Sequence, residues 1–230
     1  MKLTRVLETE VTETNDEAAL YDEMDHEGVN RQFVDDLIAA CEFDSFLEEG
    51  AIEVLDIGTG TARIPIELCD QTEDQVRVYA VDMSIPMLDI ARMNVEFSGY
   101  QERIQLDRMD AKGLEMTEGG RFAVVMSNTV IHHLPDPRLC LAEALRLVAP
   151  GGRLFFRDLV RPLSIEAVDQ LVDRHAAGEP ELARQMLHDS LRAALDLDEI
   201  RAMITELGFD AQTVQLTSDR HWTWSVAKDA

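Results

Sequence analysis

A glycine pair and an acidic residue stand where the chain can approach a nucleoside. The segment Gly58-Thr59-Gly60 follows an apolar run at 52–57, and the next apolar run, at 76–81, ends at Asp82. A Gly-x-Gly loop after a buried strand lets the backbone come close to a ligand, although such pairs also serve ordinary tight turns. A carboxylate at the end of the following strand suits the two hydroxyl groups of a ribose. Together these residues predict a cofactor that contains a ribose.

Arg63 helps to decide which ribose-containing cofactor is expected. The dinucleotide fingerprint Gly-x-Gly-x-x-Gly requires a small residue at the position that Arg63 occupies. A bulky side chain there obstructs the approach of a pyrophosphate and the packing of the helix on the strand. A nicotinamide dinucleotide is therefore disfavoured, and S-adenosylmethionine is the expected cofactor.

Two adjacent histidines are the candidates for acid–base chemistry. His132 and His133 follow the apolar run at 122–127, and a neutral imidazole near its reference pKa of ~6.5 can take a proton from an attacking hydroxyl or amine. In the other interpretation one ring packs on the loop and the other meets solvent, and neither is a base. A base is not required in every case, because methyl transfer from an activated sulfonium depends largely on alignment. Arg157, at the end of a later strand, can clamp an anionic substrate or pair with neighbouring carboxylates. We expect the substrate to contact both histidines and Arg157.

Alternating strands and helices must position these residues. Apolar runs of strand length occupy 52–57, 76–81, 104–109, 122–127 and 153–157. Helical patterns lie among them at 63–69, 86–98 and 137–148. Such alternation predicts a parallel sheet with helices on both faces. Two later runs, 211–216 and 221–227, are so close that an antiparallel hairpin is expected. The predicted fold is a Rossmann-like α/β domain with a seven-stranded, mostly parallel sheet and an antiparallel last strand.

Helical segments outside this alternation are expected to cover the site. Within a single domain spanning 1–230, residues 16–41 form an N-terminal helical cap that follows a polar arm at 1–15, which we expect to be loose. A two-helix insertion at about 163–195 should lie above the carboxyl ends of the strands as part of a lid. Its apolar positions can face a substrate or a second subunit, which leaves a homodimer open.

Five segments, taken in order, resemble the motifs of class I S-adenosylmethionine-dependent methyltransferases. The similarity is greatest to the ubiquinone/menaquinone-type branch, which contains many small-molecule methyltransferases. One departure is Ala62, where the family often has a third glycine. The segments that carry the resemblance are Val54 to Ala62, Tyr79 to Ser84, Arg108 to Ala111, Asn128 to Asp136 and Leu147 to Leu154.

The resemblance implies how the first three segments bind the cofactor. Asp56 orients the loop and, with Gly58, Thr59 and Gly60, holds the methionine end, while Asp82 holds the ribose. Met83 lies beside the adenine, although a methionine there can also fill core. Asp110, followed by Ala111, contacts the adenine amino group, but Asp107 is close in sequence and the register of this strand end stays open.

Two further parts of the chain are expected to contact the cofactor from outside the glycine loop. In related enzymes the N-terminal helix folds over the cofactor, so Tyr21 and Met24 are candidates to cap it. The alternative is an amphipathic helix that only packs on the domain. Asn128 is expected to line the site of the methyl group.

Composition excludes several classes of partner. The chain has 45 acidic and 21 basic residues and a net charge of −24, which disfavours binding to nucleic acid or to anionic lipid. No run approaches the ~18 apolar residues of a membrane span, and no signal peptide is evident, so a cytoplasmic protein is expected. The three cysteines lack a Cys-x-x-Cys spacing, which indicates free thiols and no metal site.

The expected activity is therefore methyl transfer from S-adenosylmethionine to a small-molecule acceptor through an O, N, S or C atom. Two alternatives stay open at this point. One is a methyltransferase that acts on protein or RNA, and the other is a module that binds the cofactor without catalysis. An open cleft with a basic rim would favour the first alternative, whereas the acidic charge and the insertion favour a closed site.

Overall fold

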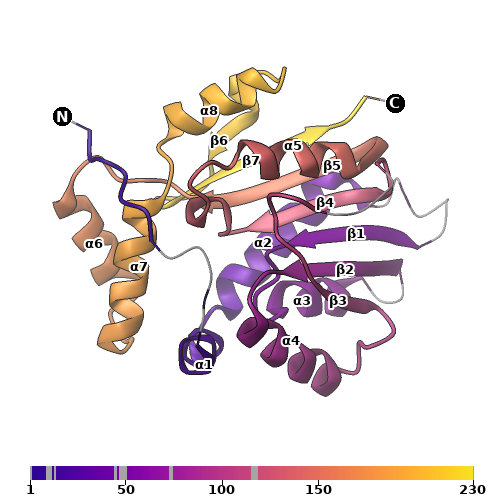
Figure 1. Ribbon diagram of the computed structural model, residues 1–230, viewed down its shortest axis with the longest axis horizontal. Coiled ribbons are helices and arrows are strands. Elements are labelled where there is room, and N and C mark those ends of the chain that lie inside the picture. The colour runs from indigo at the N-terminus through magenta and orange to yellow at the C-terminus, as the bar shows by residue number, and fades with distance from the viewer. Residues whose placement is uncertain are drawn as a thin grey trace.

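A seven-stranded sheet forms the centre of the molecule, in the order β3-β2-β1-β4-β5-β7-β6 (Figure 1). The computed structural model describes residues 2–8, 12, 14–43, 46, 51–72, 75–114 and 119–229. The strands are β1 (Ile52–Ile57), β2 (Val76–Asp82), β3 (Ile104–Arg108), β4 (Phe122–Asn128), β5 (Val148–Leu159), β6 (Val214–Leu216) and β7 (His221–Ala227). Strand β7 pairs antiparallel with β5 and β6, and the other pairings are parallel. The predicted fold class is confirmed.

Helices cover both faces of the sheet, as the buried character of the strands requires (Figure 1). Successive residues of a strand point to opposite faces, so Val54 enters one apolar core and Leu55 the other. The first core is shared with α2 (Glu27–Cys41), α3 (Arg63–Gln71) and α4 (Ile85–Ser98). The second is shared with α5 (Arg138–Leu147) and α8 (Leu197–Glu206). None of the helices in the described part of the chain has the length and apolar character of a membrane span.

Three helices lie beyond the carboxyl ends of the parallel strands (Figure 1). They are α1 (Asn15–Glu23), α6 (Ile165–His175) and α7 (Glu181–Ala193), and the last two form the segment expected as an insertion. Helices α6 and α7 pack on each other and on Leu159 at the end of β5, in an apolar cluster that is separate from the two sheet cores. This places a second layer of side chains opposite the strand ends.

The N-terminal arm differs from the expectation of a loose segment. Residues 2–8 run alongside α7 (Figure 1), and the amide of Val6 donates to the carbonyl of Arg192 at 3.1 Å. Arg5 donates to the carbonyl oxygens of Ala193 at 2.6 Å and Leu134 at 2.9 Å. One guanidinium group thus binds α7 and the loop after β4 together. Residues 1, 9–11 and 13 of the expected arm lie outside the described residues.

Two strand boundaries differ from the predicted ones. The run expected as a strand from 211 begins with a 3₁₀-helix, η5 (Ala211–Thr213), because the side chain of Asp210 accepts the amide hydrogen of Gln212 and turns the backbone. The expected strand at 153–157 is longer at both ends, and its pairing with β4 shifts register between Phe122 and Val124. The shift accommodates Gly151, which has a φ of 75°.

Candidate active site

A cavity of about 1120 Å³ lies at the carboxyl ends of the parallel strands. Its walls come from the loops after β1, β2, β3 and β4, from α1, α2 and α7, and from the turn between β6 and β7. Open α/β sheets bind their ligands at this edge. Of the residues that the sequence analysis singled out for the site, all line the cavity except Asp56.

The glycine loop has a backbone that few other residues can adopt. Gly58 and Gly60 have φ values of 74° and 55°, in the left-handed region that costs a residue with a Cβ atom roughly 1–2 kcal/mol. The amides of Gly58 and Thr59 both donate to the carbonyl of Val81, at 2.8 and 2.9 Å. A Cβ atom on Gly58 would lie 2.1 Å from Cγ2 of Val130. Gly58 is therefore required by space as well as by backbone angle.

Ala62 also has a left-handed φ, 63°, at the position where α3 begins. A third glycine, common in the family at this position, would take this conformation without strain. The alanine side chain is buried in the core beside α2 and α3. The departure noted in the sequence is thus compatible with the loop geometry.

Asp82 is fixed in the cavity wall by two backbone amides. Its Oδ2 atom accepts the amide hydrogen of Gly60 at 2.8 Å, and its Oδ1 atom accepts that of Ser84 at 2.8 Å. Burial raises the pKa of Asp82, and the amide hydrogen bonds oppose that shift. Each carboxylate oxygen keeps a lone pair for a ligand hydroxyl, so the geometry suits a diol.

Asp56 lies behind the loop and not in the cavity. It is the penultimate residue of β1 and is only 3% exposed. Burial raises its pKa to about 7, and the nearby charge of Asp82 acts in the same direction. Asp56 can therefore act on a ligand through the loop and through its charge more readily than by direct contact.

Of the two aspartates near the end of β3, Asp107 and Asp110, one faces the cavity. Asp110 lines it together with Met83 and Ala111. Asp107 does not; it accepts a hydrogen bond from the hydroxyl of Tyr79 at 2.7 Å. The register that stayed open in the sequence is settled in favour of Asp110 as the cavity residue.

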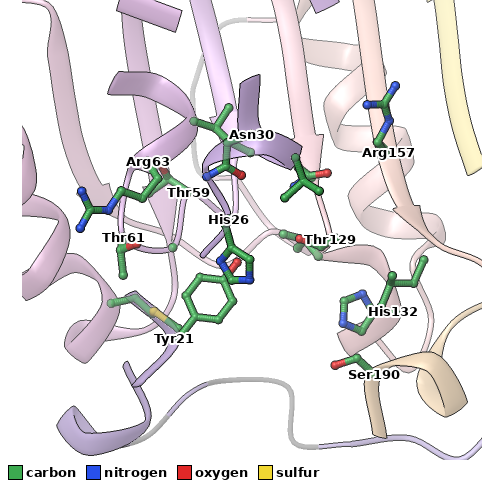
Figure 2. A pocket seen from close by; sticks show the side chains of 18 of the residues that line it. Tyr21, His26, Asn30, Thr59, Thr61, Arg63, Thr129, His132, Arg157 and Ser190 are labelled. Atoms are coloured by element: carbon green, nitrogen blue, oxygen red, sulfur yellow. The ribbon is translucent and has the colours of Figure 1, made fainter. Parts of the chain in front are cut away.

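Helix α1 is held over the glycine loop by an ion pair that the sequence analysis missed. Arg63 donates from Nη2 and Nε to the two carboxylate oxygens of Asp22, at 2.6 and 2.9 Å. Asn94 on α4 also donates to Asp22, at 3.0 Å. This anchoring brings Tyr21 and Met24 to the cavity. The ring of Tyr21 lies 5.0 Å from that of His26, and both are near the centre of the view in Figure 2.

His132 is held by carboxylates on both sides of its ring. Nδ1 lies 2.6 Å from Oδ1 of Asp158, and Nε2 lies 3.2 Å from Oε1 of Glu8. His132 is 2% and Asp158 1% exposed. Burial of the ring acts to lower its pKa, but the charges of Asp158 and Glu8, together with the hydrogen bond to Asp158, outweigh it and raise the pKa to about 9. This differs from the neutral imidazole expected from the sequence, because the two partners are far from His132 in the chain.

Arg157 and Asn128 reach the cavity from the ends of β5 and β4. Arg157 is 8% exposed, and its guanidinium group donates to Thr223 at 3.0 Å and to Asp36 at 2.6 Å. It also lies over the rings of Phe33 and Phe155. Its Nε and Nη2 atoms are therefore engaged within the protein, in line with the alternative that it pairs with a carboxylate.

The wall opposite the strand ends contains residues that the sequence analysis did not assign to the site. Ser190 of α7 lies beside His132 (Figure 2). Arg220 and His221 line the cavity from the β6–β7 turn. The sequence did not mark Arg220 as a cavity residue, because basic residues in an acidic chain usually pair with neighbouring carboxylates. Trp222 and Trp224 are two residues apart on β7, so they point to the same face of the sheet, and both are fully buried in the core.

Residues 48–220 match the sequence profile of a family described as a methyltransferase domain. The chain belongs to this methyltransferase family. The expected resemblance to class I S-adenosylmethionine-dependent methyltransferases is confirmed, and relatives of the ubiquinone/menaquinone type are among the matches.

Two relatives illustrate how far the similarity of this methyltransferase chain extends. It is 28% identical to an arsenite methyltransferase of Aquipseudomonas alcaligenes over 165 residues, which are 68% of this chain and 44% of the relative. It is 26% identical to the ubiquinone/menaquinone biosynthesis C-methyltransferase UbiE of Geobacter sp. strain M21, over 73% of this chain and 75% of the relative. The chain thus spans less than half the length of the arsenite enzyme.

Solved structures share the fold of this methyltransferase chain at low identity. The plantazolicin methyltransferase BamL, solved with a desmethyl plantazolicin analogue and S-adenosylhomocysteine (SAH), has a TM-score of 0.70 at 12% identity, over 94% of this chain and 91% of that chain. A SAM-dependent methyltransferase from Aquifex aeolicus has a TM-score of 0.61 at 14% identity, over 94% and 99% of the two chains. At such identities the likeness establishes the fold.

Proposed function

We propose that this chain transfers the methyl group of S-adenosylmethionine to a small-molecule acceptor that binds in the same cavity. The observation that carries the proposal is the convergence of the glycine loop, Asp82 and Asp110 on one cavity from three successive strand ends. Sites for drug-sized ligands measure roughly 300–1,000 Å³. A cavity of about 1120 Å³ has room for the cofactor and a second small molecule.

In this proposal, each part of the cofactor contacts a different part of the cavity wall. The ribose hydroxyls bind Asp82, and the adenine lies against Met83 and Ala111 with its amino group near Asp110. The methionine end lies on the Gly58–Gly60 loop, where the charge of Asp56 favours its ammonium group. Tyr21 and Met24 of α1 close over it, and Asn128 faces the methyl group.

The reaction is an in-line displacement at the methyl carbon. A lone pair on the acceptor forms the new bond as the carbon–sulfur bond breaks, so the sulfonium becomes the neutral thioether of SAH. An O, N or S acceptor that carries a proton loses it during transfer. Alignment by the cavity walls supplies much of the acceleration, and His132 and His133 border the acceptor side.

We further propose that the acceptor carries an anionic group that faces Arg220. Burial lowers the pKa of Arg220. Burial also lowers the pKa of His221 to about 4, and the positive charges of Arg220 and Arg157 act in the same direction. The neighbouring carboxylate of Asp219 is engaged by Arg174 and His175, at 2.6 and 3.0 Å. Arg220 is therefore better suited than Arg157, which binds Asp36, to hold an anion.

The compartment and the assembly are part of the same proposal. The cysteines Cys41, Cys69 and Cys140 are free and buried, which suits a reducing cytoplasm. The strong negative charge disfavours nucleic acid as the substrate. Size-exclusion chromatography with light scattering would measure whether the chain forms a homodimer.

Calorimetric titration with S-adenosylmethionine tests the cofactor assignment. Asp82→Asn should weaken binding at least tenfold, because charge-assisted hydrogen bonds contribute roughly 1.5–3 kcal/mol. Asp107→Asn is the matched control, because this aspartate lies near the same edge of the sheet but outside the cavity. The variant should bind S-adenosylmethionine with the affinity of the wild type. Equal affinities in all three proteins would remove Asp82 from the site.

Turnover tests the reaction itself. The protein is incubated with S-adenosylmethionine and a panel of small hydroxy, amino and thiol acids, and the SAH formed is measured. Asp82→Asn should produce less of it at subsaturating cofactor. Cofactor binding without turnover on the small-molecule panel, on RNA or on protein substrates would favour a non-catalytic binding module instead.

A further inference from the structure

Three side chains from distant parts of the chain meet at the edge of the cavity. Glu8 belongs to the N-terminal segment, whereas His132 and His133 belong to the short 3₁₀-helix η4 (Ile131–His133) after β4. Oε1 of Glu8 lies 3.2 Å from Nε2 of His132 and 3.2 Å from Nδ1 of His133. The three ligand atoms all lie within 4.8 Å of one another. Two imidazole nitrogens and one carboxylate oxygen are a common ligand set for transition metals.

Two of the three separations between these atoms suit a tetrahedral ion. Zinc–nitrogen and zinc–oxygen bonds are ~2.0–2.2 Å long, so adjacent ligand atoms in a tetrahedron lie about 3.3–3.5 Å apart. The two nitrogen–oxygen separations of 3.2 Å are close to this value. Mg²⁺ requires an octahedral set that is mostly oxygen, so the two nitrogens favour a borderline ion of the Zn²⁺ class.

Nε2 of His132 is the atom that points to a ligand. The side chain is 2% exposed, and this nitrogen has no hydrogen-bond partner despite its closeness to Glu8. Its contact with Glu8 is an ion pair without hydrogen-bond geometry, so the buried nitrogen is incompletely satisfied, and a coordinate bond would satisfy it. His132 and His133 both line the cavity.

The surroundings of the cluster already hold two of the ligands in place. Asp158 binds Nδ1 of His132 at 2.6 Å and so directs Nε2 toward Glu8. A carboxylate on the far nitrogen of a metal-binding histidine is the usual arrangement because it fixes the tautomer and the ring orientation. Glu8 is itself held by the hydroxyl of Ser190, which donates to Oε1 at 3.1 Å.

We propose that Glu8, His132 and His133 bind a divalent transition metal of the Zn²⁺ class, with a fourth coordination position open to the cavity. Because one ligand comes from the N-terminal segment, the ion ties residues 2–8 to the loop after β4. The sequence analysis expected no metal site because it considered cysteine spacing, whereas these ligands come together only in the fold. Metal binding as such does not depend on the proposed function.

One consequence does rest on the proposed function. A hydroxyl or thiol of the acceptor, bound at the open position, would lose its proton to solvent more readily. That would prepare the attacking atom beside the methyl group.

Cobalt titration tests the site directly. Protein freed of metals with a chelator is titrated with Co²⁺, whose visible bands report tetrahedral nitrogen and oxygen ligands, and Zn²⁺ is then measured by equilibrium dialysis. The wild type should bind one ion per chain. Glu8→Gln and His133→Asn should each weaken binding at least tenfold. Less than 0.2 Zn²⁺ per chain in the wild type, or unchanged affinity in both variants, would overturn the proposal.

Controls separate the metal site from folding and from cofactor binding. His188→Asn removes a histidine of α7 that lies 3.1 Å from a carboxylate oxygen of Asp189 and belongs to no metal-ligand group among the described residues. This variant should bind Co²⁺ like the wild type. Circular dichroism and S-adenosylmethionine titration of each variant show that the fold and the cofactor pocket are intact. Failure to bind metal with normal cofactor affinity would refute this inference alone, whereas normal metal binding without cofactor affinity would refute the proposed function alone.

Discussion

The carboxylate of Asp158 binds Nδ1 of His132 at 2.6 Å where both side chains are almost fully buried. The same carboxylate accepts amide hydrogens from Ile131 at 2.5 Å and from Leu159 at 2.6 Å. One side chain at the end of β5 therefore fixes both the histidine and the turn that presents it to the cavity.

Replacing Asp158 should destabilise the fold strongly. Asp158→Ala leaves a buried imidazole and the three amides of Ile131, His132 and Leu159 without their acceptor, and breaking a buried charge pair costs about 3–5 kcal/mol. Urea denaturation measures the loss in the free energy of unfolding. Asp89→Asn is the control, because its pair with Arg92 is exposed, and such pairs contribute about 0–1 kcal/mol. Equal losses in the two variants would contradict the assigned importance of Asp158.

Gly58→Ala should impair both stability and cofactor binding. The added Cβ atom meets Val130 at 2.1 Å in addition to the strain of a φ of 74°. Gly99→Ala isolates the strain, because Gly99 has a φ of 77° and nothing within 4 Å of its Cβ position. Gly58→Ala should lose about 1–3 kcal/mol more unfolding free energy than Gly99→Ala, and its affinity for S-adenosylmethionine should fall at least tenfold. Denaturation curves that match in the two variants would show that the loop relaxes without cost.

The residues that could be predicted from sequence share one property: they occupy fixed positions in a repeating pattern. Asp82 ends a strand and Gly58 follows one, so alternation alone brings them to the same edge of the sheet. The antiparallel β7 was predictable because only a short turn separates it from β6.

The missed contacts involve single charged residues that are far apart in the chain. Glu8 meets His132 because tertiary contacts, among them those of Arg5, hold the N-terminal segment against α7 and the loop after β4. Arg63 could be used to exclude a dinucleotide, but its pairing with Asp22 has no periodic signal. The pKa of His132 could not be anticipated for the same reason, since its partners are set by tertiary structure.

Cofactor affinity should rise with pH through about 7. Burial raises the pKa of Asp56 to about 7, and the cationic methionine end of the cofactor favours the ionised carboxylate, so binding is weaker where Asp56 is protonated. Calorimetry from pH 5.5 to 8.5 should show this rise in the wild type and in Asp107→Asn. In Asp56→Asn the rise should be absent, and a pH-independent affinity in the wild type would exclude the coupling.

The raised pKa of Asp56 has the opposite effect on stability: its contribution to the free energy of unfolding falls as the pH rises. The unfolded chain releases the proton of Asp56 near pH 3.8 and the folded chain near 7, so the folded state binds more protons between these values. This contribution to stability is therefore greatest below pH 3.8, declines as the pH rises to 7, and is constant above it. Asp56→Asn should remove this decline from the pH profile of the free energy of unfolding.

Arg220 should determine the affinity for an anionic acceptor without affecting the cofactor. A charge-assisted hydrogen bond contributes roughly 1.5–3 kcal/mol, so Arg220→Gln should raise the KM of an anionic acceptor identified by turnover at least tenfold. The Kd of S-adenosylmethionine should stay unchanged, because Arg220 lies on the β6–β7 turn, whereas the residues assigned to the cofactor lie on the segment of α1 and at the ends of β1 to β4. Arg92→Gln, which removes an exposed charge of α4, should leave both constants at the wild-type value. An uncharged analogue of the acceptor should have the same KM with the wild type and with Arg220→Gln. A KM increase of the same size for the charged and uncharged molecules would mean that Arg220 shapes the cavity and does not bind an anion.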